Sequence, residues 1–345
     1  MFAQGSDIIK MAEFRTPISK KIISLQNNPD TGTPRILIPP SPYMKQLGYG
    51  TGVNVYLMER FSPVQGCYKS PWAVKKPNRR VKDEDEKYVK RLNYEADILK
   101  SLKHQNIIGY RSYSYQKDGT QCLVMESGEK SLADIIESRQ VDELGPLPSS
   151  QILKVAWDVC SALVYLHEEK HLLHGDLKSP NILIKGNFEI AKLCDFGVTL
   201  KLDDKGMVST EDYSGGTVCW SAPEALLGDT MTDKTDMFSF GLVLWEMLSL
   251  NPPHLDKISH SSTLTDDLTT IKDDESEEEL YQEFYKAVGT RPSLPNVKLS
   301  SDYIPVLELF YSCTEAEPAR RPSAKQVLHV LECLKDKDEG NNENL

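Results

Sequence analysis

The sequence predicts an α+β protein of two lobes, in which a small antiparallel sheet with one helix precedes a larger, mainly helical lobe. Two patterns predict this division. Short runs of alternating or β-branched apolar residues fall within residues 46–127, whereas longer segments with apolar residues three and four apart fill residues 128–334. A chain of 345 residues is long enough to bury the core of such a unit.

The small lobe is expected to contain four strands and one helix. The segments GVNVYLM (52–58) and SPWAVKK (70–76) predict two strands, and residues 106–115 and 122–126 predict two more on either side of a KDG turn. The helix between the two pairs lies in VKRLNYEADILKSL (89–102). Its predicted buried face consists of Val89, Leu92, Ala96, Leu99 and Leu102.

The larger lobe is predicted from a series of helical segments. A helix over 131–139 is followed by a long helix that begins at Ser149 or Ser150, where either hydroxyl is expected to cap the first turn. The buried stripe of this long helix is Ile152, Val155, Val159, Ala162, Leu163 and Leu166. Two short strands are expected at 182–186 and 191–195. Further helices are expected near 237–250, 306–313 and 323–335, and the first of these is a core helix interrupted by Glu246.

Charge and cysteine usage exclude several classes of protein. A net charge of -11 disfavours broad binding to nucleic acid or to an anionic membrane, because both depend on clustered Lys and Arg. The seven cysteines form no C-x-x-C pair and predict neither a disulfide framework nor a zinc site. The start of the chain does not resemble a secretory signal, and no uncharged apolar run reaches bilayer length. We therefore expect a cytoplasmic and nuclear protein that binds neither nucleic acid nor membrane directly.

Two segments are expected to flank the folded unit of 46–334, and a third is expected to form an insert within it. Residues 1–45 are rich in Pro, Ser, Thr and Lys and predict a flexible regulatory extension, and residues 335–345 predict a flexible tail. Residues 256–283 form an insert dense in Asp, Glu, Ser and Thr. This insert is interpreted as a solvated acidic loop, with a docking site for a basic partner as the alternative.

A series of motifs, in a fixed order, carries the chemistry. They are LGYGTGVNV, AVK, a Glu in the following helix, ME at a strand end, HGDLKSPN, DFG, APE, TDMFSFG and PARRPS. Each is common by itself, but together and in this order over residues 47–334 they resemble the eukaryotic protein kinases. The resemblance implies a bilobal protein kinase fold, with ATP and Mg²⁺ as cofactors.

The resemblance assigns the nucleotide site to the first part of the chain. Gly48 and Gly50 are two glycines of the phosphate-covering loop; the third is displaced, because Val53 stands in its place and Gly52 comes one residue early. Lys75 is the phosphate-binding lysine and Glu95 its ion-pair partner, and strand alternation turns Lys76 to the opposite face. The remaining nucleotide-binding positions are Leu47, Val55, Ala73, Met125 at the back of the adenine pocket, Glu126 at the start of the hinge and Leu183 on the pocket floor.

The resemblance assigns the transfer chemistry to two loops. Asp176 orients the substrate hydroxyl, Lys178 stabilises the transferring phosphoryl group, and Asn181 and Asp195 hold Mg²⁺. Thr217 contacts the catalytic Asp and helps to set a preference for Ser or Thr. Glu224 and Arg321 are expected to form a buried ion pair.

Gly175 departs from the family pattern, which usually has an Arg there. That Arg commonly binds a phosphate on the activation loop, and glycine cannot. We expect the chemistry to survive and the usual electrostatic switch to be weakened or rerouted. A pseudokinase scaffold is the alternative: Gly175 and the displaced Gly52 favour it, whereas intact Lys75, Glu95 and Asp176, with the two metal-binding residues, favour an enzyme.

Several segments in both lobes, together with FRTP near the start, resemble one branch of the family, the mitogen-activated protein kinase kinase-like, dual-specificity enzymes of dividing cells. This implies protein substrates such as MAP kinases and other mitotic proteins, with Tyr as a further acceptor. Thr16, in a Thr-Pro pair followed by lysines, is the predicted site for an upstream proline-directed mitotic kinase, and an unmodified Thr-Pro dipeptide is the alternative. A PDZ-domain partner for the NNENL tail is left open, because Glu343 replaces the expected Thr or Ser.

Overall fold

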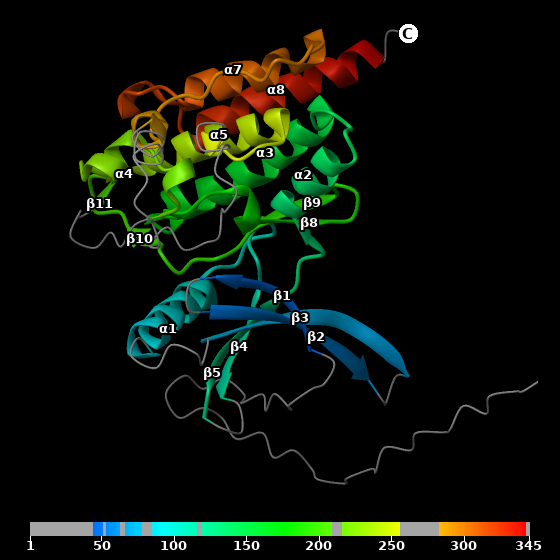
Figure 1. The fold of residues 1–345 in the computed structure, drawn as a ribbon, viewed down its shortest axis with the longest axis vertical. Helices are drawn as coiled ribbons and strands as arrows, with labels where there is room; N and C mark the ends of the chain where they lie inside the picture. The colour runs from blue at the N-terminus through cyan, green and yellow to red at the C-terminus, as the bar shows by residue number, and fades with distance from the viewer. Residues whose placement is uncertain are drawn as a thin grey trace, which may run out of the picture.

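The structure, a computed structural model, describes residues 44–50, 53–62, 66–77, 85–115, 119–208, 216–255 and 283–342. The predicted phosphosite Thr16, the displaced Gly52 and most of the acidic insert lie outside these residues, as do nearly all of the N-terminal extension and the last three residues of the tail. Within them the predicted α+β, two-lobe arrangement is confirmed, with a sheet at one end of the molecule and helices at the other (Figure 1).

The small lobe is a five-stranded antiparallel sheet in the order β1-β2-β3-β5-β4, with one helix, α1 (Asp85–Ser101), against it. Its strands are β1 (Met44–Gly50), β2 (Val53–Ser62), β3 (Cys67–Pro77), β4 (Tyr110–Tyr115) and β5 (Gln121–Glu126). The register places Ala73 opposite Met125 and Val55 opposite Lys75. Residues predicted to surround a nucleotide are therefore cross-strand neighbours.

The larger lobe is built around α5 (Asp233–Ser249). The helices near it are α2 (Leu132–Val141), α3 (Ser149–Val164), α4 (Pro223–Leu227), α7 (Ile304–Cys313) and α8 (Ala324–Asn342). A small sheet of β6 (Lys130–Ser131), β8 (Ile182–Lys185) and β9 (Ile190–Leu193) lies on the side facing the small lobe (Figure 1). The short strands β7, β10, β11 and β12 occupy Leu172–Leu173, Leu200–Lys201, Met207–Val208 and Met231–Thr232.

The predicted apolar faces are the ones that become buried. Leu92, Ala96, Leu99 and Leu102 of α1 and its end are buried, Val89 is half-buried, and the whole predicted stripe of the long helix is buried. Helix α5 is buried without interruption from Thr235 to Leu248. Because this stretch includes Asp236 and Glu246, two carboxylates lie in the core with the apolar residues.

Two predicted boundaries differ from the structure. The prediction that Ser149 or Ser150 caps α3 was wrong: Pro148 is the N-cap and no side chain caps the turn. The reason is that Ser149 is already helical, and its hydroxyl donates instead to Asp302 at 2.6 Å. Helix α8 also continues to Asn342, past the helix end predicted at 335 and into the predicted tail of 335–345. None of the described helices is long and apolar enough to cross a membrane.

The predicted ion pair between Glu224 and Arg321 is present and buried. The guanidinium lies 2.7 and 2.9 Å from the two carboxylate oxygens, and its side chain is 0% exposed. Arg321 also donates to the backbone carbonyls of Lys234, Glu315 and Ala316. One buried cation therefore joins α4, α5 and the turn before α8.

We predict that Glu224→Gln lowers the free energy of unfolding by about 3 to 5 kcal/mol, because it leaves the Arg321 charge buried without a partner. Glu317→Gln is the matched control. It removes a 2.8 Å pair with Arg320 in which both side chains are mostly exposed, and it should cost less than about 1 kcal/mol. Urea denaturation of the three proteins measures both values, and equal losses would contradict the buried-pair interpretation.

Candidate active site

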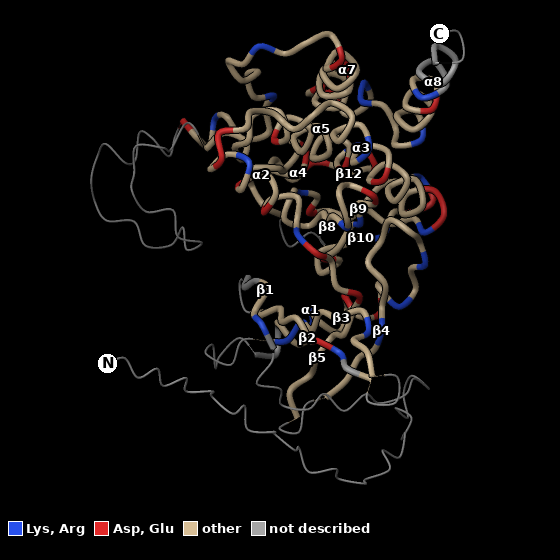
Figure 2. The backbone as a smooth tube through the Cα atoms, turned by 90° about the vertical axis from the view of Figure 1, so that its right-hand side faces the viewer, with Lys and Arg blue, Asp and Glu red and all other residues tan. Residues whose placement is uncertain are grey.

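A cleft of about 540 Å³ is lined by residues from both lobes. Figure 2 shows the two lobes from the side, with Lys, Arg, Asp and Glu spread over both of them. The apolar lining includes Leu47, Val55, Ala73 and Met125 from the small lobe and Leu183 from β8, and the polar lining includes Lys75, Glu95, Lys178, Asn181 and Asp195. The cleft therefore joins an apolar space to a charged end, as a nucleotide requires.

Lys75 occupies the charged end of the cleft. Its Nζ lies 2.9 Å from Glu95 Oε2 on α1 and 2.8 Å from Asp195 Oδ1, which follows β9. The adjacent Lys76 points to the other face of β3, where its Nζ lies 4.3 Å from the centre of the Tyr56 ring. Strand alternation thus distinguished the two lysines correctly.

The ion network keeps Lys75 and Asp195 charged. Burial by itself lowers the pKa of Lys75, but the charges of Asp195 and Glu95 outweigh it and raise that pKa overall. Burial also acts to raise the pKa of Asp195, and the Lys75 charge instead holds it well below its usual range. Both groups are therefore ionised at neutral pH.

Asp195 has a backbone conformation that side chains rarely adopt. Its φ is 62°, in the left-handed region. Its Oδ1 accepts from Lys75 and from the backbone N–H of Gly197 at 3.3 Å, and its side chain is 36% exposed in the cleft. Such strained residues concentrate at functional sites, where surrounding contacts hold them.

The second group of predicted residues meets at Asp176. Its Oδ2 lies 2.9 Å from Lys178 Nζ and accepts from Asn181 Nδ2 at 3.1 Å. Its Oδ1 accepts from the backbone N–H of Thr217 at 2.9 Å and from the Thr217 hydroxyl at 2.7 Å. Lys178 also donates to the Thr217 hydroxyl. The contact predicted between Thr217 and Asp176 is thus present.

Asp176 is ionised despite its burial. Burial acts to raise its pKa, but the Lys178 charge and the hydrogen bonds from Lys178 and Thr217 lower it overall. A carboxylate in this position can accept a hydrogen bond from an incoming hydroxyl.

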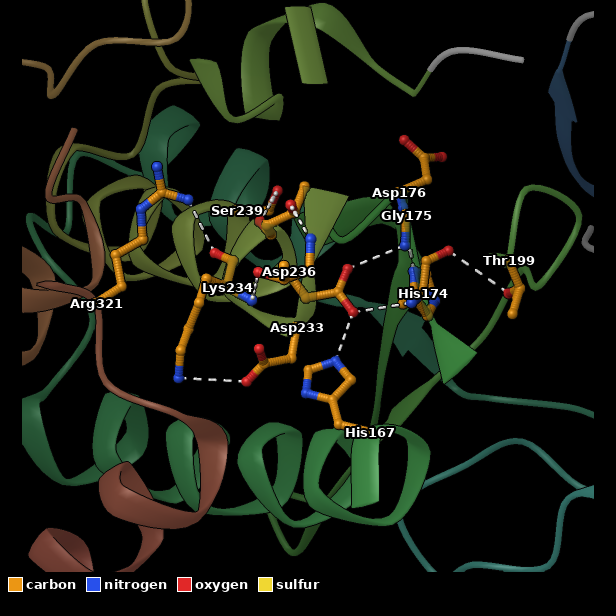
Figure 3. A network of polar contacts seen from close by, with 12 residues as sticks. His167, His174, Gly175, Asp176, Thr199, Asp233, Lys234, Asp236, Ser239 and Arg321 are labelled. Carbon is orange, nitrogen blue, oxygen red and sulfur yellow. Dashed lines mark hydrogen bonds and ion pairs between the residues drawn. The ribbon is translucent and has the colours of Figure 1, made fainter. Parts of the chain in front are cut away.

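Asp236 on α5 holds the start of this loop (Figure 3). Its carboxylate accepts from the backbone N–H groups of His174 at 2.8 Å and Gly175 at 3.0 Å, and it pairs with His167 Nε2 at 2.8 Å. Asp236 lies in the TDMFSFG motif, from which no role was predicted for it. The sequence signal that could have indicated a role for Asp236 is a carboxylate inside an otherwise apolar helix.

Gly175 has a conformational reason to be glycine. Its φ is 79°, and a Cβ at this position would lie 3.0 Å from the Val198 carbonyl oxygen. A side chain here would meet both backbone strain and a close contact.

Of the remaining predicted residues, Leu47 and Glu126 line the cleft. Gly48 and Gly50 lie on β1, opposite Val55 and Val53 of β2, and Leu47 is 47% exposed. The Glu126 carboxylate pairs with Lys185 and Lys192 and accepts from the backbone N–H of Gly109 at 3.1 Å. Glu126, which was predicted to begin the hinge, therefore forms ion pairs that join β5 to the sheet of β8 and β9.

Residues 43–331 match the family model described as the protein kinase domain. The chain belongs to the protein kinase family. The resemblance stated from its motifs is therefore confirmed, and so is the bilobal kinase fold.

Curated relatives of this kinase differ in how much of it they match. It is 46% identical to the human lymphokine-activated killer T-cell-originated protein kinase, over 93% of this chain and 98% of that protein. It is 35% identical to rat mitogen-activated protein kinase kinase kinase 12 over 47% of this chain, which is 17% of that protein. It is also 28% identical to an inactive leucine-rich repeat receptor-like serine/threonine-protein kinase of Arabidopsis thaliana, over 73% of this chain and 36% of that protein. Similarity alone therefore does not separate active from inactive members, and the polar groups of the cleft must do so.

We predict that Gly175→Ala lowers both kinase activity and thermal stability more than Gly206→Ala does. The two glycines have similar positive φ values, 79° and 73°, so each alanine adds about 1 to 2 kcal/mol of backbone strain. Only at Gly175 would the new Cβ contact a carbonyl, since nothing lies within 4 Å at Gly206. Melting temperatures and turnover rates of both variants test this, and equal behaviour would show that the Val198 contact is unimportant.

Proposed function

We propose that this kinase transfers the γ-phosphoryl group of ATP to Ser or Thr hydroxyls of proteins, with Tyr as a further acceptor and Mg²⁺ as the metal. The observation that supports it most is that Lys75, Asp195, Asn181 and Lys178 line one cleft while Lys178 also contacts Asp176. A phosphate-binding cation, two metal ligands and a hydroxyl-orienting carboxylate are the groups that phosphoryl transfer requires.

The donor set fits Mg²⁺ bound together with a nucleotide. No cluster of three or more His, Cys, Asp or Glu suited to a metal occurs in the part of the chain that the structure describes. Mg²⁺ commonly uses one or two protein oxygens and takes further ligands from phosphates and water. Asp195 offers a carboxylate at the cleft, and Asn181, whose amide nitrogen donates to Asp176, retains its amide oxygen for a cation. When bound, Mg·ATP supplies the phosphoryl group and a charge that offsets its oxygens.

The chain's own residues would then bind and orient the reactants. Val55 and Ala73 from the sheet and Leu183 from β8 enclose the adenine, and the Lys75 ammonium meets the phosphates. Asp176 accepts the hydrogen bond of the substrate hydroxyl and fixes its direction. Thr217, bonded to Asp176, supports the preference for Ser or Thr because it lies where the acceptor residue must approach.

The pseudokinase scaffold is the second candidate, and Gly175 and the displaced Gly52 were the features that favoured it. The geometry of Gly175 weakens that support, because its positive φ and the nearby Val198 carbonyl explain why a glycine stands there. The residue at this position also supplies no reacting group. The polar groups at Lys75, Glu95, Asp176, Asn181 and Asp195 favour the enzyme.

The wider role is proposed from the family branch. We place this kinase among the mitogen-activated protein kinase kinase-like enzymes, with MAP kinases and other mitotic proteins as substrates, in cytoplasm and nucleus. Activation would follow phosphorylation of Thr16 by a proline-directed mitotic kinase. Binding of the NNENL tail to a PDZ domain stays an open prediction.

The direct test is transfer of radiolabelled phosphate from Mg·ATP to a peptide mixture containing Ser, Thr or Tyr as acceptor. Asp176→Asn should lower turnover by about 100-fold or more, because the amide cannot accept the hydroxyl proton. Asp229→Asn, at an exposed position, is the matched control and should match the wild type. Equal residual transfer by wild type and Asp176→Asn would favour the scaffold.

The proposed switch is tested by mapping phosphopeptides of the full chain from mitotic and resting cells. Thr16 should carry phosphate in mitosis, and Thr16→Ala should lose the mitotic rise in activity. Thr33→Ala removes another Thr-Pro pair and should keep that rise. An unmodified Thr16 in mitotic cells would remove this switch from the proposal.

A further inference from the structure

The sheet of the small lobe has a second apolar face, on the side away from the cleft. We call it the outer face, and it consists of Met58 on β2, Trp72 and Val74 on β3, and Cys122 and Val124 on β5. Alternation along the strands turns these side chains away from Ala73 and Met125, which line the cleft and belong to the main core. The outer face is therefore a separate apolar cluster.

The described helices do not explain why the outer face is buried. Helix α1 is the described helix in extensive contact with this sheet, and its apolar stripe clusters with Leu123 and Met125 on the opposite face. The helices of the larger lobe lie at the other end of the molecule (Figure 1). Yet Val74, Cys122 and Val124 are each 0% exposed. The outer face therefore requires a further covering layer.

A buried hydroxyl on the same face indicates that this layer is a peptide chain. Ser112 on β4 is the cross-strand partner of Val124 and is 1% exposed. Its Oγ has no hydrogen-bond partner among the described residues. Leaving a buried hydroxyl unpaired costs free energy, and a peptide backbone carries the donors and acceptors that would pair with it.

The chain itself has a suitable segment shortly before β1. Residues 34–39, PRILIP, contain three successive apolar side chains, Ile36, Leu37 and Ile38, and no acidic residue. The proline at each end of this segment favours an extended backbone. Side chains alternate in an extended chain, so Ile36 and Ile38 fall on one side of it.

The outer face is within reach of this segment. Strand β1 begins at Met44, whose backbone partner is Met58 of the outer face. Ile36 and Ile38 precede Met44 by eight and six residues, which allows roughly 20 to 28 Å of extended chain. From β2 across β3 to β5 is two strand spacings, or about 10 Å. The segment can therefore cross the face without any movement of the strands.

We propose that residues 34–39 dock on the outer face of the small-lobe sheet. Ile36 and Ile38 pack against the apolar side chains of β3 and β5, and the backbone of the segment pairs with the Ser112 hydroxyl. Docking within the chain does not depend on the proposed phosphoryl transfer.

The docked segment would enclose β3 between two layers, with α1 on one face and residues 34–39 on the other. Sheets in domains bury their apolar faces in this way. The strand that carries Lys75 would then be joined to the extension that carries Thr16.

The thiol of Cys122 reports whether the outer face is covered. The full-length wild type and Ile36→Ser/Ile38→Ser are treated with a maleimide under native conditions, and labelling of Cys122 is followed by peptide mass spectrometry. We expect Cys122 to react at least about ten-fold faster in this variant, because two isoleucine side chains no longer hold the segment on the sheet. Ile22→Ser/Ile23→Ser makes the same change elsewhere in the extension and should react at the wild-type rate.

Cys160, which is 0% exposed in α3, distinguishes local uncovering from unfolding. Its labelling should be equally slow in all three proteins, since global unfolding would expose both thiols. The proposal is overturned if Ile36→Ser/Ile38→Ser leaves the rate at Cys122 unchanged, or if Ile22→Ser/Ile23→Ser raises it equally. It is also overturned if Cys122 stays protected in Ile36→Ser/Ile38→Ser and loses protection on dilution, because a second copy then covers the face.

Tryptic cleavage of the full-length wild type tests the docking without any change in the segment, and it decides if the labelled variant unfolds. The bonds after Arg35 and Lys21 both precede an isoleucine, and only the first lies within residues 34–39. Normalised to a peptide of residues 16–43, cleavage after Arg35 should be at least about ten-fold slower than cleavage after Lys21. Trp72→Ala removes part of the outer face and should reduce this difference. Equal normalised rates in the wild type would contradict docking.

Discussion

The site depends first on the ammonium of Lys75, which lies between two carboxylates, at 2.9 Å from Glu95 and 2.8 Å from Asp195. These three residues come from β3, from α1 and from the segment after β9, so one buried cation fixes the sheet, the helix and that segment relative to one another. Without it, two carboxylates would face each other in a poorly solvated space, and burial already raises the pKa of Glu95. The same charge that would meet a nucleotide phosphate thus also assembles the site.

The second half of the site is held from below by α5. The buried carboxylates of α5 accept hydrogen bonds from the backbone of His174 and Gly175 and from the Trp220 side chain. This one helix therefore sets the positions of the neighbouring Asp176 and Thr217. At Gly175 this chain lacks the Arg that, in the family pattern, commonly binds a phosphate on the activation loop. Hydrogen bonds already present in the chain hold the segment after Asp195: the Tyr94 hydroxyl donates to the Thr199 carbonyl at 2.7 Å, from the residue next to Glu95. This contact joins α1 to the segment after Asp195.

The sequence was sufficient for the features that local periodicity and motif order determine. Four strands of the small lobe, the buried face of α1 and the choice of Lys75 over Lys76 follow from periods of 2 and 3.6, whereas the strand β1 was not predicted. The N-cap of α3 was wrong because Ser149 binds Asp302, a residue far along the chain, and no local pattern reveals that contact. The left-handed backbone at Gly175 and Asp195 was not predicted either, because no local pattern revealed it. Glu246 was noticed only as an interruption of an apolar run, since its donors Ser179 and Trp220 are brought to it by tertiary structure.

Calorimetric titration of Mg·ATP into the wild type, Lys75→Met and Lys76→Met tests whether Lys75 both assembles the cleft and binds the nucleotide. The two variants make the same chemical change on adjacent residues of β3, one inside the cleft and one over the Tyr56 ring. We expect Lys76→Met to bind Mg·ATP as the wild type does and Lys75→Met to bind it at least about ten-fold more weakly, the scale of one lost charge-assisted contact. Wild-type affinity in Lys75→Met, or an equal loss in both variants, would contradict it.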